Sequence, residues 1–93
     1  MKTMIRKHWI FYGDVQGVGF RSRACHAAEQ LGVTGWVKNL WNGSVEMESE
    51  GEEAAIERLI ANIQSSRAIE IVRMESKEIP TCGSTYFSIR RGN

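Results

Sequence analysis

The chain has 93 residues, of which 42% are hydrophobic and 25% charged, and its formal net charge is +1. That length suits one compact domain with a modest core, so we expect a single domain over residues 1–93. The near-neutral charge argues against a general nucleic-acid binder, and no segment approaches the ~20 apolar residues of a membrane span.

The first third of the chain shows a strand pattern, a glycine-containing loop and a helix pattern. Residues 5–13 are rich in aromatic and β-branched residues, which predicts a strand with Trp9 and Phe11 on one face. Residues 14–20 form a short loop with two glycines. Apolar residues at positions 24, 27, 28 and 31 predict a helix over residues 21–31, with Gly32 placed as its C-cap.

The rest of the chain predicts two strands, a second helix and two more strands. Residues 34–40 and 44–50 form a hairpin with a turn at Asn42-Gly43, and Glu46, Glu48 and Glu50 fall on one face, which we expect to be solvated. Residues 52–65 form a helix with an apolar stripe and with acidic residues at its positive end. Strands follow at 69–78 and 86–90, joined by a loop at 80–85.

The element order is βαββαβ with a small β extension. Each helix has one apolar stripe, and the Glu-bearing strand has one polar face. Two helices on one face of an antiparallel sheet satisfy both patterns, which predicts an α+β protein of the ferredoxin-like, split βαβ architecture. Because this architecture hosts many functions, the function must be argued from the site.

The loop before the first helix carries the most chemical information. It runs through Val15, Gln16, Gly17, Val18, Gly19 and Phe20 to Arg21. Unpaired backbone N–H groups at a helix start favour a bound anion, and glycines let successive N–H groups point inward. The planar guanidinium of Arg21 can grip two phosphoryl oxygens. From these residues alone, a phosphate-binding loop and a tight turn with a solvent-facing arginine both stay open.

The motif VQGVGFR, which ends at Arg21, is followed by GWVKN at residues 35–39 and by NGSVE from Asn42. These segments resemble the acylphosphatase family, whose signatures are a G-x-V-Q-G-V-x-F-R loop and a G-W/Y-V-x-N strand. The resemblance covers nearly the whole chain, including the F-x-I-R ending at residues 87–90. It implies a ferredoxin-like fold and hydrolysis of small acyl phosphates to a carboxylate and inorganic phosphate, with no metal and no cofactor.

The resemblance also implies roles for single residues. Arg21 and the backbone amides from about Gln16 to Arg21 would bind the phosphate, and Asn39 would hold the attacking water. An amide is not a base, but its oxygen can accept a hydrogen bond from water. The carboxylate that leaves an acyl phosphate has a pKa of about 4 and needs no proton. A site without a strong acid or base therefore suits this substrate.

Several other residues have side chains that could serve in a site. His8 and His26 have no spaced partner ligand, so we expect structural or surface roles. The acidic residues between positions 46 and 53 lack EF-hand spacing, so we expect no metal site. Arg90 and Arg91 would attract an anionic substrate if the last strand ends near the loop, and a solvated basic tail fits equally well. Relatives often end with a tyrosine soon after this arginine, whereas this chain has RGN at residues 91–93.

Two departures from the family pattern bear on specificity. Trp41 stands where relatives usually have a small, polar or proline residue, and it would either pack on an aromatic acyl group or cover the hairpin tip. Asp14 precedes the loop where basic or small residues are common, and we expect its carboxylate to point away from the anion.

A few features of the sequence bear on cellular location, oligomeric state and the state of the cysteines. The apolar run at residues 9–12 is too short for a signal peptide, so we expect a cytoplasmic protein, and nothing demands a partner, so we expect a monomer. In a reducing compartment Cys25 and Cys82 would be free thiols, although a bridge between them stays open. The competing functions are a non-catalytic anion-binding or interaction module and a ferredoxin-like RNA binder. The acidic sheet face argues against the RNA binder.

Overall fold

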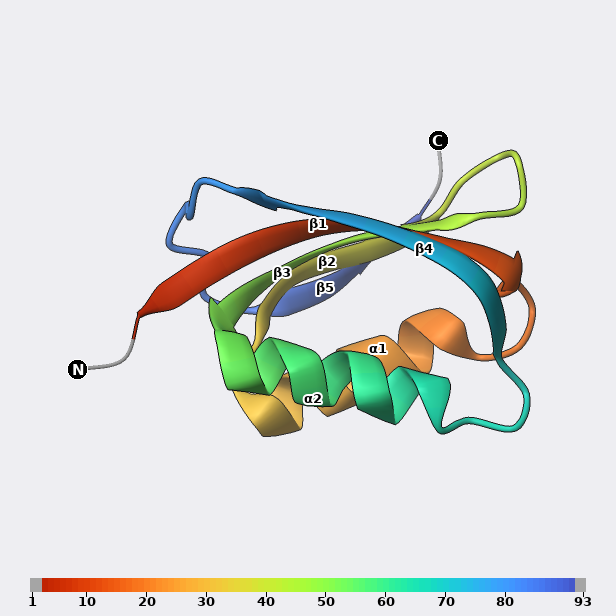
Figure 1. Ribbon diagram of the computed structural model, residues 1–93, viewed down its shortest axis with the longest axis horizontal. Coiled ribbons are helices and arrows are strands. Elements are labelled where there is room, and N and C mark those ends of the chain that lie inside the picture. Colours follow the sequence, from red (N-terminus) through yellow and green to blue (C-terminus); the bar gives the residue numbers. More distant parts are fainter. Residues whose placement is uncertain (1–2, 92–93) are drawn as a thin grey trace.

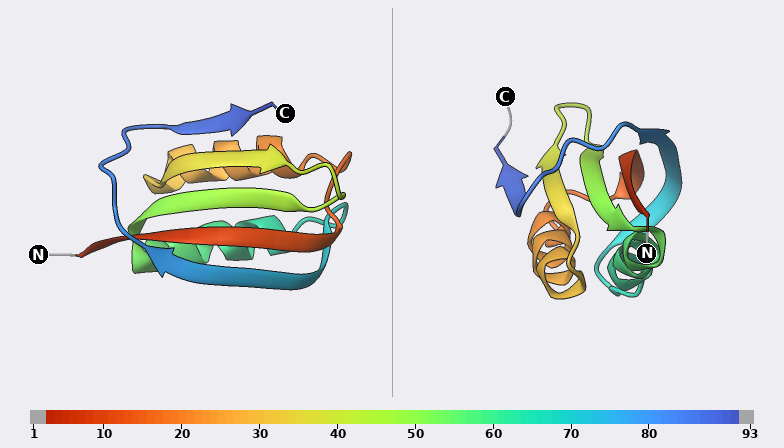
Figure 2. Two further views of the ribbon diagram at one scale, coloured as in Figure 1. Left: turned by 90° about the horizontal axis from the view of Figure 1, so that it is seen from above. Right: turned by 90° about the vertical axis from the view of Figure 1, so that its left-hand side faces the viewer.

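The computed structural model describes residues 3–91 of the chain. Its elements are, in chain order, β1 (Met4–Asp14), α1 (Phe20–Leu31), β2 (Thr34–Asn39), β3 (Val45–Glu52), α2 (Glu53–Gln64), β4 (Glu70–Ile79) and β5 (Phe87–Arg90). The strands form one sheet in the order β4-β1-β3-β2-β5. Both helices lie on the same face of this sheet (Figures 1 and 2). The predicted α+β, ferredoxin-like architecture is confirmed, and every predicted element is present.

The sheet is mixed rather than antiparallel throughout. The four strands β4, β1, β3 and β2 pair antiparallel, but β5 pairs with β2 in the parallel sense. The chain crosses from β4 to the opposite edge at the end of the sheet where β4 stops, as Figure 2 shows. β5 therefore runs opposite to β4, which makes it parallel to β2 and corrects the antiparallel prediction for this strand.

The core lies between the sheet and the two helices. On β1 the rings of Trp9 and Phe11 stack with centroids 5.7 Å apart, and the Phe20 ring lies 5.0 Å from Phe11. Phe20 is the first residue of α1 and is only 2% exposed. Its burial fixes where α1 begins, directly after the glycine loop. None of the helices within residues 3–91 is long and apolar enough to cross a bilayer.

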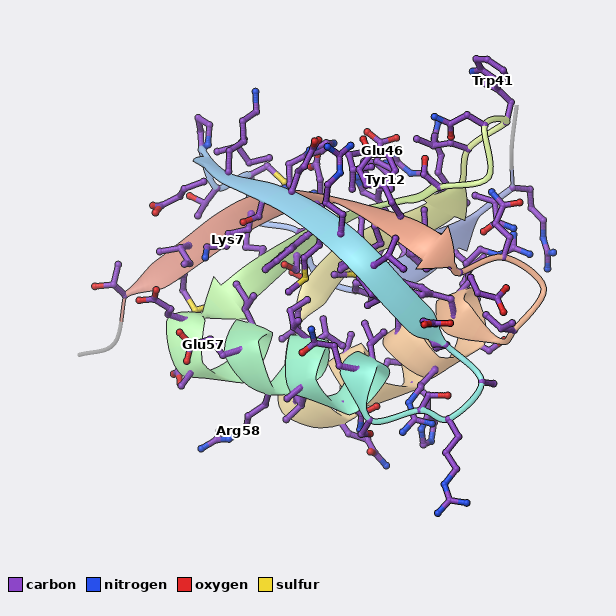
Figure 3. The ribbon with its side chains drawn as sticks, turned by 45° about the vertical axis from the view of Figure 1, so that its right-hand side comes forward. Lys7, Tyr12, Trp41, Glu46, Glu57 and Arg58 are labelled. Atoms are coloured by element: carbon purple, nitrogen blue, oxygen red, sulfur yellow. The ribbon has the colours of Figure 1, made fainter. Side chains whose placement is uncertain are left out.

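The other face of the sheet carries a network of charged side chains. The Arg6 guanidinium on β1 donates hydrogen bonds to Glu48 at 2.8 Å and to Glu50 at 3.0 Å. His8 lies 2.7 Å from Glu46, which Figure 3 shows on the side of the sheet away from α2. The prediction of a solvated glutamate face is therefore wrong for Glu50, which is 5% exposed.

The burial of Glu50 has a simple cause in the tertiary structure. The segment after β4 folds over this face, and the backbone N–H groups of Cys82 and Gly83 donate to the Glu50 carboxylate at 2.9 and 3.0 Å. Burial by itself would raise the pKa of Glu50, but these two amides and Arg6 stabilise the charged form, so the pKa lies below its ordinary value. This network attaches the β4–β5 connection to the sheet.

Candidate active site

The loop predicted to bind phosphate joins the end of β1 to the start of α1. Gly17 and Gly19 have φ angles of 74° and 79°, in the left-handed region that favours glycine. Gly19 occupies the N-cap position, and no side chain caps the helix there. The first N–H groups of α1 are therefore free of side-chain capping, and the positive end of the helix dipole faces the loop.

A cleft of about 90 Å³ opens between this loop and the end of β2. It is lined by Val15, Gly17, Gly19, Phe20, Arg21, Ser22 and Asn39. Six of the eight residues predicted for the site thus line one cavity. Arg21 and Asn39, which lie 18 positions apart in the sequence, face the same small volume. Arg21 is the one charged residue of the lining, so the cleft favours an anion.

The two polar side chains predicted for catalysis have few partners inside the protein. Within residues 3–91, no acidic side chain forms an ion pair with Arg21. In the same part of the chain, Oδ1 of Asn39 is buried and has no hydrogen-bond partner. A buried acceptor left without a donor costs free energy, so its presence in a native structure calls for an explanation. Its position in the cleft wall fits an amide that binds something other than the protein.

Gln16 and Val18 are not among the residues that line the cleft. Val18 is half-buried and packs against the core. The Gln16 side chain donates hydrogen bonds to the backbone carbonyls of Leu40 and Ser44 in the β2–β3 connection. Conversely, Ser22 lines the cleft although it lies outside the two motifs that predicted the site. Ser22 could have been selected because it directly follows Arg21 in the first turn of α1.

The remaining candidates lie away from the cleft. His26 is exposed, and His8 has a structural partner in Glu46. Asp14 is exposed and outside the cleft lining, as expected. Within the described part of the chain, no three His, Cys, Asp or Glu residues are grouped so that they could hold a metal ion.

The C-terminal arginine lies outside the cleft lining, and the hairpin tryptophan is exposed to solvent. The Arg90 guanidinium lies 4.3 Å from the centroid of the Trp36 ring and lines a separate hollow with Arg6, so it does not reach the anion cleft. Arg91 is exposed, and residues 92–93 lie outside the described part. Trp41 is 98% exposed and projects from the hairpin tip in Figure 3, so it does not cover the hairpin.

Both cysteines are free thiols, which agrees with the prediction and leaves no bridge between them. Cys25 is half-buried on α1, and burial raises the pKa of its thiol, with the Glu29 carboxylate adding to the effect. Cys82 is exposed in the segment that covers Glu50.

Comparison with known proteins settles the family. The sequence profile of the acylphosphatase family matches residues 7–89. The chain belongs to the acylphosphatase family. An acylphosphatase of Methanospirillum hungatei JF-1 is 41% identical over 90 residues, which cover 95% of this chain and 99% of that protein.

Solved structures of the family agree. The structure of acylphosphatase from Bacillus subtilis superposes with a TM-score of 0.85 at 32% identity and covers 92% of this chain and 98% of that one. An acylphosphatase from Coxiella burnetii gives a TM-score of 0.86 at 33% identity over 94% of this chain and 93% of that one. The family and fold inferred from the two motifs are therefore confirmed.

Proposed function

We propose that this member of the acylphosphatase family hydrolyses small acyl phosphates to a carboxylate and inorganic phosphate in the cleft between residues 15–21 and Asn39. The observation that carries the proposal is the convergence of Arg21, the glycine loop and Asn39 on one cavity. Family membership supports the reaction, and the cavity supports the assignment of residues to it.

The phosphoryl group is bound by the loop and by Arg21. Backbone N–H groups from about Gly17 to Arg21 surround the phosphoryl oxygens, in a geometry that the left-handed Gly17 and Gly19 permit. The guanidinium of Arg21 adds charge-assisted hydrogen bonds to two of those oxygens. Because these donors are fixed before the reaction, they stabilise the charge spread over the equatorial oxygens in the transition state.

The attacking water is held by Asn39. A rotation about its last side-chain bond presents the unpartnered Oδ1 to the cleft, where it accepts a hydrogen bond from water. The water oxygen forms a bond to phosphorus, and the bond between phosphorus and the acyl oxygen breaks. The electron pair of that bond leaves with the carboxylate, and a proton of the water passes to a phosphate oxygen.

The cleft suits this substrate class because its lining holds no acid or base. None of its lining residues carries a carboxyl, imidazole or thiol group that could act as a general acid or base near neutral pH. A carboxylate with a pKa of about 4 leaves without protonation, whereas the alkoxide of a phosphate monoester requires an acid. The proposed route uses only residues of this chain and water, with no metal and no cofactor.

We also propose that residues 1–93 form one domain, which works as a monomer in the cytoplasm. The 15–21 loop and Asn39 of a single copy line one cleft together, which supports a site formed within one copy. The free thiols of Cys25 and Cys82 are compatible with a reducing compartment. Sedimentation of the purified protein during turnover tests the oligomeric state, and an active dimer would refute it.

The decisive experiment measures benzoyl phosphate hydrolysis in the presence of a chelator. Arg21→Ala should raise KM and lower kcat/KM by at least about 10³-fold, and Asn39→Ala should lower kcat by about 10²-fold with little change in KM. Arg58→Ala is the matched control, because this substitution also removes one arginine charge. Arg58 is exposed on α2 (Figure 3). Full activity of the Asn39 variant would exclude its proposed role. Phosphate binding without turnover by the wild type would favour the non-catalytic module instead.

A further inference from the structure

The side chain of Gln16 connects the anion loop to the hairpin that carries Asn39. Its Nε2 group donates to the carbonyl oxygen of Leu40 at 2.7 Å and to that of Ser44 at 2.9 Å. Leu40 directly follows Asn39, and Ser44 directly precedes β3. A single amide group thus holds both arms of the connection between β2 and β3, and both of its N–H hydrogens are used.

The hairpin does not need Gln16 to close. The Leu40 N–H donates to the Ser44 carbonyl at 2.9 Å, and the Gly43 N–H donates to the Leu40 carbonyl at 3.2 Å. The Asn42 side chain accepts hydrogen bonds from the backbone N–H and the hydroxyl of Ser44. Because the connection is already closed by its own bonds, the two bonds from Gln16 fix its position relative to the loop rather than its shape.

Such a connection is needed because the two halves of the cleft do not lie on neighbouring strands. The loop follows β1, whereas Asn39 ends β2, and β3 lies between these two strands in the sheet. Gln16 immediately precedes Gly17, the first glycine of the cleft lining. We propose that Gln16 is a positioning residue: its side chain sets the distance and direction of Asn39 relative to the phosphoryl group in the loop.

This inference rests on the proposed function, since it assigns Gln16 a role in aiming the water that Asn39 holds. Attack at phosphorus requires a near-linear approach, and a displacement of about 1 Å between reacting groups can cost up to about 10²-fold in rate. Binding of the phosphate is less sensitive, because Arg21 and the loop amides remain in place without the two hydrogen bonds. The expected signature is a loss in kcat without a matching loss in phosphate affinity.

The test uses Gln16→Met, which keeps the length of the side chain but removes both donors. We expect kcat for benzoyl phosphate to fall by about tenfold or more, while the inhibition constant of inorganic phosphate changes by less than about threefold. Gln64→Met is the matched control, because Gln64 is exposed at the end of α2 and should keep wild-type kinetics. Unchanged kcat in Gln16→Met, or a loss of phosphate affinity as large as the loss of kcat, would overturn the inference.

A double variant separates positioning from general damage. If Gln16 acts through Asn39, adding Gln16→Met to Asn39→Ala should lower kcat by less than about twofold further. A merely structural effect would multiply the two losses, and that result contradicts the inference. A wild type without hydrolysis refutes the proposed function itself, whereas normal Gln16→Met activity beside a slow Asn39→Ala refutes only the role of Gln16.

If Gln16→Met does not fold, NMR of the wild type provides the second measurement. The side-chain amide hydrogens of Gln16 should exchange with solvent more slowly than those of Gln30 and Gln64, which are exposed. Binding of inorganic phosphate to the loop should slow the Gln16 exchange further, because it orders the segment that bears Gln16. Equal exchange rates for all three amides would show that the connection is not formed and would overturn the inference.

Discussion

Replacing Glu50 by glutamine should destabilise the protein and make its stability less dependent on acid. Glu50 is 5% exposed and accepts hydrogen bonds from Arg6, Cys82 and Gly83 at 2.9–3.0 Å. Glutamine has the same shape but only one acceptor oxygen, so its NH₂ group must face at least one of these donors. Arg6 keeps its ion pair with Glu48 but loses the negative charge of its second partner, Glu50.

The size of the effect follows from the groups left unpaired. One buried donor facing another donor, together with the loss of one partner of a buried ion pair, costs about 3 kcal/mol in the free energy of unfolding. For a domain of this size, each kcal/mol shifts the melting temperature by about 4–8 °C, so the midpoint should fall by about 12–24 °C. Urea unfolding at neutral pH measures the difference. Glu57→Gln is the control, because Glu57 is exposed on α2 (Figure 3).

The pH dependence gives the reasoning a second check. The folded-state pKa of Glu50 lies below its ordinary value of 4.5, so the charged form is favoured by folding. Its contribution to stability is fully present above the unfolded-state pKa and is lost as the pH falls through the folded-state pKa. The difference in the free energy of unfolding between wild type and Glu50→Gln should therefore narrow below about pH 4. A gap under about 0.5 kcal/mol at neutral pH, or one that stays constant into acid, would refute this account.

Three further substitutions test the backbone and the hairpin. Gly35→Ala should prevent folding or cost more than about 3 kcal/mol, because a Cβ there would lie 2.0 Å from the Glu48 carbonyl oxygen; a normal unfolding midpoint would contradict this. Gly19→Ala should lower the free energy of unfolding by only about 1–2 kcal/mol, because its Cβ would meet nothing within 4 Å and the only strain comes from the left-handed φ. Urea titration compares the stabilities of the Gly35 and Gly19 variants. Trp41→Ser should leave the ratio of kcat/KM for benzoyl and acetyl phosphate unchanged within about twofold, because the side chain is 98% exposed, and a larger change would show that Trp41 contacts the acyl group.

Periodic patterns made most of the fold predictable. The apolar stripes of both helices face the core as expected, and Gly32 ends α1 in the left-handed conformation with its N–H bonded to Ala28. The direction of β5 was not predictable in the same way. A four-residue strand carries almost no pairing signal, and its direction follows from the route of the β4–β5 connection across the sheet.

The burial of charged residues on the other face of the sheet could not be predicted from local sequence patterns. Alternation along β3 places Glu50 correctly on the face away from the helices, but its burial depends on Arg6, 44 positions away, and on amides at positions 82 and 83. The side-chain role of Gln16 has the same origin, because its partners are backbone carbonyls 24 and 28 positions further on. Carbonyls are present at every residue, so no residue type in the sequence marks them as partners.

Asn39 could not have been selected from residue type alone, yet the strand period explains its position once the topology is known. Side chains alternate along β2, so Val37 and Asn39 share the face that packs against α1, whereas Trp36 and Lys38 lie on the other face. Val37 is fully buried in the core, and two residues later the strand ends level with the start of α1. If the alternation of side chains along β2 were shifted by one residue, Lys38 or Leu40 would point toward the anion instead of Asn39. The asparagine is thus the first position on the helix-facing side of β2 that leaves the core and meets the loop, which is where a polar group can reach a bound phosphoryl group.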